Sequence, residues 1–322
     1  MSSPKERFLI TGAGGCIGAW VSTLLAQEDC YVVGLDLDTT ARRLHAIAGE
    51  NLSKKIIIEQ GDITNKDDIA RTVNEHKITN VIHLAALQVP FCKADPILGA
   101  KVNVTGTVNL FEVVRDNADQ IRGVTYASSV ALFGPNDSKI ASTDEHGVGA
   151  QPETLYGVYK QSNEGTARIY WLEHNVPSIG LRPYTVYGPG RDQGLTSAPT
   201  MAIEAAIRGE PYTIPFGGIS IYNYAPDVAT FFIQASRTAA QSTSREAQVF
   251  NIPGSRVDME EVIATIEIAI PEAQGLINYD KSVHLPFPTS LATNGLKHAI
   301  GEVKVSAFSE AIQETATHLA KT

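Results

Sequence analysis

The fold is decided near the start of the chain by the stretch Phe8-Leu9-Ile10-Thr11-Gly12-Ala13-Gly14-Gly15-Cys16-Ile17-Gly18. Its apolar first part predicts a buried strand, and its glycines predict a tight turn into a helix. Gly12 allows the turn, Gly15 lets backbone N–H groups approach a pyrophosphate, and Gly18 lets the helix pack close to the sheet. The stretch therefore predicts a dinucleotide site. We expect its phosphate contacts from Gly12, Gly15, Cys16, Ile17 and Gly18.

A second apolar run, residues 31–35, ends on Asp36. At this distance from the glycine turn, a carboxylate accepts hydrogen bonds from the ribose hydroxyls and repels a ribose 2′-phosphate. Asp38 adds a second negative charge nearby. Arg42 and Arg43 argue the other way, because either side chain is long enough to reach a phosphate. On balance the sequence predicts NAD rather than NADP.

Composition and charge limit the classes of partner. The chain has 322 residues, of which 43% are hydrophobic and 19% charged, as is typical of a soluble globular protein. Its net charge of −9 argues against a nucleic-acid or membrane partner, which would need a basic face. The polar first residues predict no signal peptide, and no run approaches the roughly 18 apolar residues of a membrane span.

Cysteine and histidine usage points the same way. The cysteines are Cys16, Cys30 and Cys92, an odd number without metal-ligand spacing, and the eight histidines lack zinc-site spacing. We therefore expect a reduced, cytoplasmic protein without a metal site.

Short apolar runs alternate with helical patterns as far as residue 182. This alternation is typical of an α/β fold, a doubly wound parallel Rossmann sheet covered by helices on both faces. Long helices are predicted at about 96–117 and 156–174. Prolines then break the pattern. We expect an NAD-binding Rossmann domain at 1–183, with returns near 227–252, and a smaller C-terminal substrate-binding lobe at 184–322.

The strongest chemical signal combines a serine and a helix. Ser129 follows the fifth predicted strand, and Tyr156 and Lys160 lie four residues apart, on one face of the second long helix. A free tyrosine has a pKa of about 10. A neighbouring ammonium group and the positive nicotinamide ring would lower it. Together the three residues can take a proton from a hydroxyl while a hydride leaves its carbon for the nicotinamide.

The chain resembles the extended short-chain dehydrogenase/reductases, an NAD-dependent family that includes nucleotide-sugar epimerases and dehydratases. The resemblance covers nearly the whole chain. Its motifs occur in the family's order, at residues 11–18, 61–63, 83–86, 103–107, 128–129, 156–160 and 181–190.

The resemblance implies roles for individual residues. Asp62 and Ile63 should contact the adenine. Asn103 should contact the cofactor and help to fix the active-site helix. Leu84, Ala85 and Ala86 should line the path of the pyrophosphate and the nicotinamide ribose.

For the chemical step, the resemblance implies Ser129 as the catalytic serine and Tyr156 as the catalytic base. Lys160 should be the partner of Tyr156 and should also hold the nicotinamide ribose.

Two departures from the family bear on the substrate. Nucleotide-sugar members commonly have an asparagine where this chain has Thr185, and a phosphate-binding arginine where it has Ser220. Losing one charge-assisted contact costs about 1.5–3 kcal/mol. We therefore expect a secondary alcohol or sugar-like hydroxyl on a non-nucleotide substrate, bound by Ser129, Tyr184, Thr185 and Arg191.

Other outcomes remain open. An epimerase or dehydratase that retains its NAD would use the same serine, tyrosine and lysine. A non-catalytic dinucleotide sensor would need none of the three. Apolar residues on the two long helices, such as Val104, Val108, Phe111, Ile169 and Trp171, predict a homodimer that packs through these helices.

Overall fold

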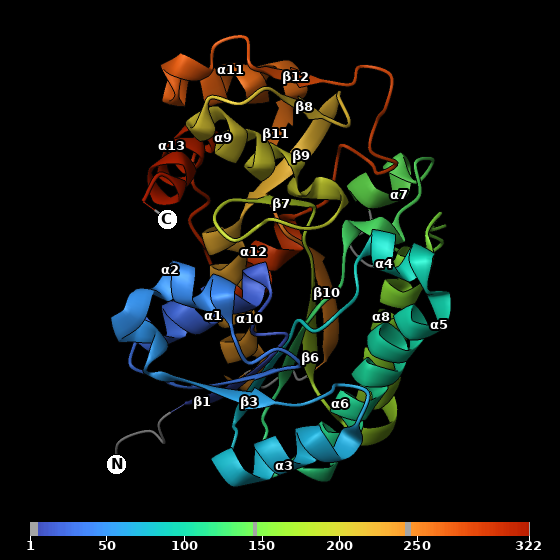
Figure 1. Cartoon of the computed structure of the whole chain (residues 1–322). Helices are drawn as coiled ribbons and strands as arrows, with labels where there is room; N and C mark the ends of the chain where they lie inside the picture. The colour runs from blue at the N-terminus through green and yellow to red at the C-terminus, as the bar shows by residue number, and fades with distance from the viewer. Residues whose placement is uncertain (1–5, 144–146, 242–245, 322) are drawn as a thin grey trace.

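The computed structural model describes residues 6–143, 147–241 and 246–321. Within these ranges, seven parallel strands form the central sheet, in the order β10-β6-β5-β4-β1-β2-β3 (Figure 1). The strands are β1 (Arg7–Thr11), β2 (Tyr31–Asp36), β3 (Ile56–Gln60), β4 (Asn80–His83), β5 (Val124–Ala127), β6 (Ser178–Arg182) and β10 (Ala247–Asn251). The predicted doubly wound Rossmann fold is confirmed.

Helices cover both faces of this sheet. One layer contains α1 (Cys16–Gln27), α2 (Arg42–Ser53) and α10 (Ala225–Gln241). The other contains α3 (Lys66–His76), α6 (Gly106–Asp116) and α8 (Leu155–His174). Side chains along β1 point alternately to the two faces of the sheet. Phe8 and Ile10 pack in the core under α1 and α10, whereas Leu9 packs toward α3 and α6.

The smaller lobe, which the sequence predicts to bind substrate, is built mostly after β6 and lies above the sheet in Figure 1. Its sheets are β7 (Thr185–Tyr187) with β9 (Ile219–Tyr224) and β11 (Ser255–Asp258), and β8 (Tyr212–Ile214) with β12 (Ile277–Tyr279). Its helices α9 (Ala198–Arg208), α11 (Met259–Ala269) and α13 (Phe308–Leu319) close a separate apolar core. We propose a domain boundary after Pro183, with α10 and β10 belonging to the Rossmann part.

The first predicted long helix is interrupted. It consists of α5 (Pro96–Ala100), a π-helical turn η1 (Lys101–Thr105) and α6. A short helix α4 (Val89–Ala94), which the sequence did not predict, precedes it. The wider π turn places the Asn103 side chain against the backbone of Leu87, where it both donates and accepts a hydrogen bond.

The remaining described helices are short. They are η2 (Val130–Leu132), α7 (Ser138–Thr143), η3 (Leu195–Ser197), η4 (Pro271–Ala273) and α12 (Asn294–Ile300). Across the described ranges, no helix is both long enough and apolar enough to cross a lipid bilayer.

Candidate active site

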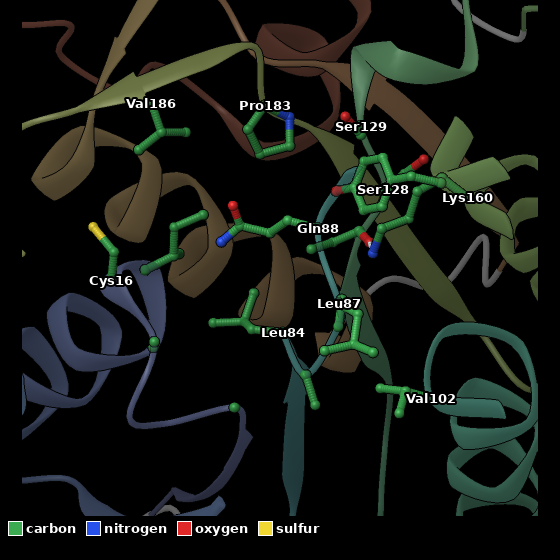
Figure 2. Close-up of a pocket in the computed structure, with 18 of the residues that line it drawn as sticks. Cys16, Leu84, Leu87, Gln88, Val102, Ser128, Ser129, Lys160, Pro183 and Val186 are labelled. Carbon is green, nitrogen blue, oxygen red and sulfur yellow. Dashed lines mark hydrogen bonds between the residues drawn. The ribbon is translucent and has the colours of Figure 1, made fainter. Parts of the chain in front are cut away.

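A cleft of about 410 Å³ lies at the carboxyl ends of the central strands and reaches the substrate-binding lobe (Figure 2). Its lining includes nearly all the residues that the sequence predicts for the cofactor and the reaction. Asp36 and Asp62 stand at one end, and Ser129, Tyr156 and Lys160 stand at the other. A crevice at this edge of an open α/β sheet is where ligands bind.

The glycine turn has the shape that a bound pyrophosphate requires. Gly12 has φ +71°, and a Cβ there would lie 2.7 Å from the amide nitrogen of Ala85. A Cβ on Gly18 would lie 2.2 Å from the carbonyl oxygen of Gly12. Both positions therefore exclude any side chain, and the N-terminus of α1 stays open to phosphate oxygens. These observations fit NAD.

The adenosine end of the cleft is acidic. Asp36 Oδ2 accepts a hydrogen bond from the backbone nitrogen of Gly14 at 2.9 Å, so the carboxylate is fixed beside the turn. Arg43 pairs with Asp192, with Nε and Nη2 at 2.9 and 2.7 Å from Oδ1, and also donates to the carbonyl of Gly14. Arg43 is thus engaged elsewhere and does not offset the preference of Asp36 for a free ribose hydroxyl.

The buried residue His83 links the end of β1 to the start of α6. His83 Nδ1 lies 2.7 Å from Thr11 Oγ1, and Nε2 lies 3.1 Å from Thr107 Oγ1. Thr107 donates its one hydroxyl hydrogen to the carbonyl of Asn103, so it must accept from the histidine Nε2–H. Nδ1 then accepts from Thr11. Burial lowers the pKa of His83 to about 3, which keeps the ring neutral.

Asn103 acts at one remove from the cofactor. Its side chain is buried outside the cleft lining and bonds Leu87, with Oδ1 accepting from the backbone nitrogen at 2.7 Å and Nδ2 donating to the carbonyl at 2.9 Å. The expected direct contact between Asn103 and NAD does not fit this geometry. What Asn103 fixes is the loop that follows Ala86.

The reacting residues converge at the start of α8. Thr154 caps this helix by accepting from the backbone nitrogen of Gly157, which sets Tyr156 in the first turn. Lys160 donates to the carbonyl of Ala127 at 2.6 Å, and its Nζ lies 5.5 Å from the centre of the Tyr156 ring. Ser129 extends from the end of β5 into the same part of the cleft.

The electrostatics of the free protein correct one expectation. Burial raises the pKa of Tyr156, opposed by hydrogen bonding to Ser129 and by the charge of Arg191. Burial also lowers the pKa of Lys160 to about 8, opposed chiefly by Cys92 and Glu164. In the protein alone, the pKa of Tyr156 therefore lies above its ordinary value, because burial outweighs the hydrogen bond with Ser129 and the charge of Arg191.

Two residues behind the site were missed in the sequence. Arg182, fully buried, donates through Nε and Nη2 to the two carboxylate oxygens of Glu164 at 2.8 and 2.7 Å. Ser128 also donates to Glu164. The available signals were the four-residue spacing from Lys160 to Glu164 and a charged residue at the end of an apolar strand.

Of the residues expected to bind substrate, Tyr184 and Arg191 line the cleft, but Thr185 does not. The hydroxyl of Thr185 lies 2.9 Å from that of Ser220, and the two residues are 0% and 2% exposed. Each therefore satisfies the other inside the lobe. The expectation that Thr185 contacts substrate is wrong, because β7 turns this side chain toward β9 and away from the cleft.

Arg191 is unusual among the lining residues. Nη2 donates to Thr196 Oγ1 at 3.2 Å, whereas the buried Nε has no acceptor within the described chain. A buried donor left unpaired costs about 1–3 kcal/mol.

The described residues contain no group of three or more potential metal ligands.

Comparisons with known proteins agree with this geometry. Residues 8–252 match the model of the NAD dependent epimerase/dehydratase family. Protein CapI of Staphylococcus aureus is 33% identical over 57% of this chain and 55% of its own length. UDP-glucuronate 4-epimerase 2 of Arabidopsis thaliana is 27% identical over 87% of this chain and 68% of its own length.

Among solved structures, a partial consensus L-threonine 3-dehydrogenase (E-change) superposes with a TM-score of 0.83 at 25% identity, over 98% of this chain and 100% of that one. UDP-glucose 4-epimerase of Thermus thermophilus, in complex with NAD, gives a TM-score of 0.80 at 24% identity, over 97% and 98% of the two chains. The second similarity shows the fold.

Proposed function

Because the chain belongs to the NAD-dependent epimerase/dehydratase family, we propose that it is a dehydrogenase that oxidises a secondary hydroxyl of a small, non-nucleotide substrate and releases NADH. The chain is an NAD-dependent enzyme of the short-chain dehydrogenase/reductase type. The substrate and the release of NADH are the proposed parts.

The proposed chemistry assigns each reacting residue one task. Ser129 binds the substrate hydroxyl oxygen, and Tyr156 accepts its proton. Lys160, fixed by the carbonyl of Ala127, provides positive charge beside the phenol and holds the nicotinamide ribose. NAD supplies the hydride acceptor and, when oxidised, the positive charge that favours the phenolate.

One observation carries the substrate assignment, the hydrogen bond between Thr185 and Ser220. These positions would have to face a nucleotide, yet both are buried and neutral. Among the described residues that line the cleft, the cationic side chains are Lys160 and Arg191. Lys160 belongs to the reaction. A second pyrophosphate, that of a nucleotide sugar, would therefore have little positive charge to bind.

A second candidate, an epimerase that retains its NAD, is favoured by contacts that hold the lobe over the glycine loop. The carbonyl of Pro189 accepts from Trp20 Nε1 at 2.9 Å, and Asp192 pairs with Arg43. These contacts would slow cofactor exchange. The relatives named UDP-glucuronate 4-epimerases support the same candidate.

Net NADH distinguishes the two candidates. We expect free sugars, sugar acids or small hydroxy compounds to yield NADH in proportion to substrate consumed, measured by absorbance with product analysis. We expect UDP- and dTDP-sugars neither to bind nor to react. An isomerised product without NADH, or micromolar binding of a UDP-sugar to the NAD-bound protein in calorimetry, would establish the epimerase instead.

Cofactor choice is a separate prediction. We expect NADP to bind at least about tenfold more weakly than NAD, since a like-charge contact at a partly buried site costs on the order of 1–4 kcal/mol. Dissociation constants for both cofactors, measured with Asp36→Ser and with Asp38→Ser as control, test it. The gap should narrow in the first variant and persist in the second. Equal affinities in the unmodified protein would contradict the prediction.

We also propose a cytoplasmic homodimer. The residues exposed on α5 and α8, which lie side by side (Figure 1), include Ile97 at 83% and Leu172 at 58%. Ile169 is also exposed, whereas Phe111 is buried in the core and takes no part. Light scattering should give twice the chain mass of 34.6 kDa. Replacing Ile97 and Leu172 by aspartate should give monomers, and a monomer before replacement would refute the proposal.

The free cysteines fit the reducing compartment that we propose for this protein.

A further inference from the structure

We propose that Arg191, Gln88 and Thr196 form an anchor for a substrate carboxylate, facing Ser129 and Tyr156 across the cleft. The inference rests on the proposed function and narrows its substrate class to small hydroxy acids. All three anchor residues line the cleft. Gln88 was not among the predicted site residues, although it directly follows the 83–86 motif and Leu87.

Gln88 reaches into the middle of the cavity. Figure 2 shows its amide between Cys16 on one side and Ser129 and Lys160 on the other. It precedes α4 as the N-cap residue, yet its side chain makes no capping bond. The amide is therefore free of a local structural task and faces the space where a substrate would lie beside the nicotinamide.

Gly194 leaves room for this arrangement. It has φ +97°, and a Cβ built on it would stand 1.8 Å from Gln88 Oε1 and 3.4 Å from Arg191 Nη2. The amide of Gln88 and the guanidinium of Arg191 thus both lie beside Gly194, although they come from different parts of the fold. Any larger residue at position 194 would displace the Gln88 amide.

The guanidinium has hydrogen-bonding capacity to spare. Thr196 accepts from Nη2 and orients the plane, while Nε lacks an acceptor within the described chain. Adjacent N–H groups on the edge of a guanidinium match the two oxygens of a carboxylate. The neighbouring Asp192, which would be the nearest competitor, is held by Arg43.

The charges of the lining residues also favour a substrate with a carboxylate. The acidic lining residues, Asp36 and Asp62, lie at the adenosine end, so the lobe end of the cleft has Arg191 without an opposing carboxylate among the described lining residues. Lys160 is held by Ala127. A substrate with one carboxylate would bring this region to charge balance, whereas a neutral alcohol would leave the partly buried Arg191 without an anionic partner among the described lining residues.

The test compares short hydroxy acids with their primary amides, which keep the carbon skeleton and the hydroxyl but lose the charge. Both are assayed on the NAD-loaded protein and on Arg191→Gln, Gln88→Leu and, as a control for loss of one positive charge, Arg208→Gln at the exposed end of α9. We expect Arg191→Gln to lower kcat/KM for the acid about 10- to 100-fold and leave the amide nearly unchanged. Gln88→Leu should have a smaller effect of the same kind, and Arg208→Gln none.

Calorimetry of the same acids and amides on the NAD-loaded protein separates this inference from the proposed function. If no compound yields NADH but acids bind more tightly than amides, and Arg191→Gln abolishes that difference, the anchor stands and the dehydrogenase assignment fails. Equal affinity for acid and amide would overturn the anchor. A sugar phosphate that binds more tightly than every acid would also overturn it. So would a loss of NAD affinity in Arg191→Gln that exceeds the loss for the acid, because Arg191 would then serve the cofactor pyrophosphate.

Discussion

Tyr156→Phe should lower turnover by about two to four orders of magnitude, the usual contribution of a positioned general base. The substitution removes the phenolic oxygen and keeps the ring, so the packing at the start of α8 should persist. NAD affinity should change little, because the glycine turn, Asp36 and Lys160 remain. Stopped-flow measurement of hydride transfer and fluorescence titration of NAD test the two parts separately.

Tyr159→Phe is the matched control. This tyrosine lies on the same helix, but its hydroxyl donates to the carbonyl of Pro96 at 2.9 Å and it does not line the cleft. It should retain nearly full turnover. If Tyr156→Phe kept most of its activity while Tyr159→Phe behaved as expected, a group other than Tyr156 would be the base.

Arg182→Met should destabilise the fold by about 3–5 kcal/mol, the usual cost of removing one partner from a buried ion pair. The substitution keeps much of the apolar volume but leaves the Glu164 carboxylate without the two hydrogen bonds that Arg182 donates. Chemical denaturation, monitored by circular dichroism, gives the free energy of unfolding. A change below about 1 kcal/mol would show that the pair contributes little.

A double variant isolates the interaction between Arg182 and Glu164. Glu164→Leu combined with Arg182→Met removes both charges, so it should be more stable than Arg182→Met alone.

Glu164 also bears on the reaction, because its charge raises the pKa of Lys160 against the effect of burial. Glu164→Gln should therefore lower the pKa of Lys160 and move the alkaline limit of activity to lower pH.

Much of the site could be predicted because its signals are local. The glycine turn, Asp36 and the spacing of Tyr156 and Lys160 each depend on a few neighbouring residues and on one strand or helix. The buried pair of Thr185 and Ser220 could not be predicted in this way. It depends on the parallel pairing of β7 with β9, in which Thr185 lies opposite Tyr222, and this register is invisible in either segment alone.

Two further differences have the same origin. The π-helical turn sets Asn103 against Leu87, which lies in a different part of the chain, so this contact cannot be recognised in either segment alone. The raised pKa of Tyr156 arises from its burial in the folded protein. Sequence spacing placed Lys160 near the phenol, but only the packing determines how much solvation each group loses.

The position of β10 at the edge of the central sheet has a consequence for synthesis of the chain. Its partner strand β6 ends at Arg182, but β10 begins only at Ala247, after β7, α9, β8, β9 and α10 have been made. Until then, the nascent polypeptide leaves the backbone of β6 unpaired on the side that later receives β10. Such an edge can pair with other chains. Shielding of this edge should therefore matter most between the synthesis of β6 and the synthesis of β10.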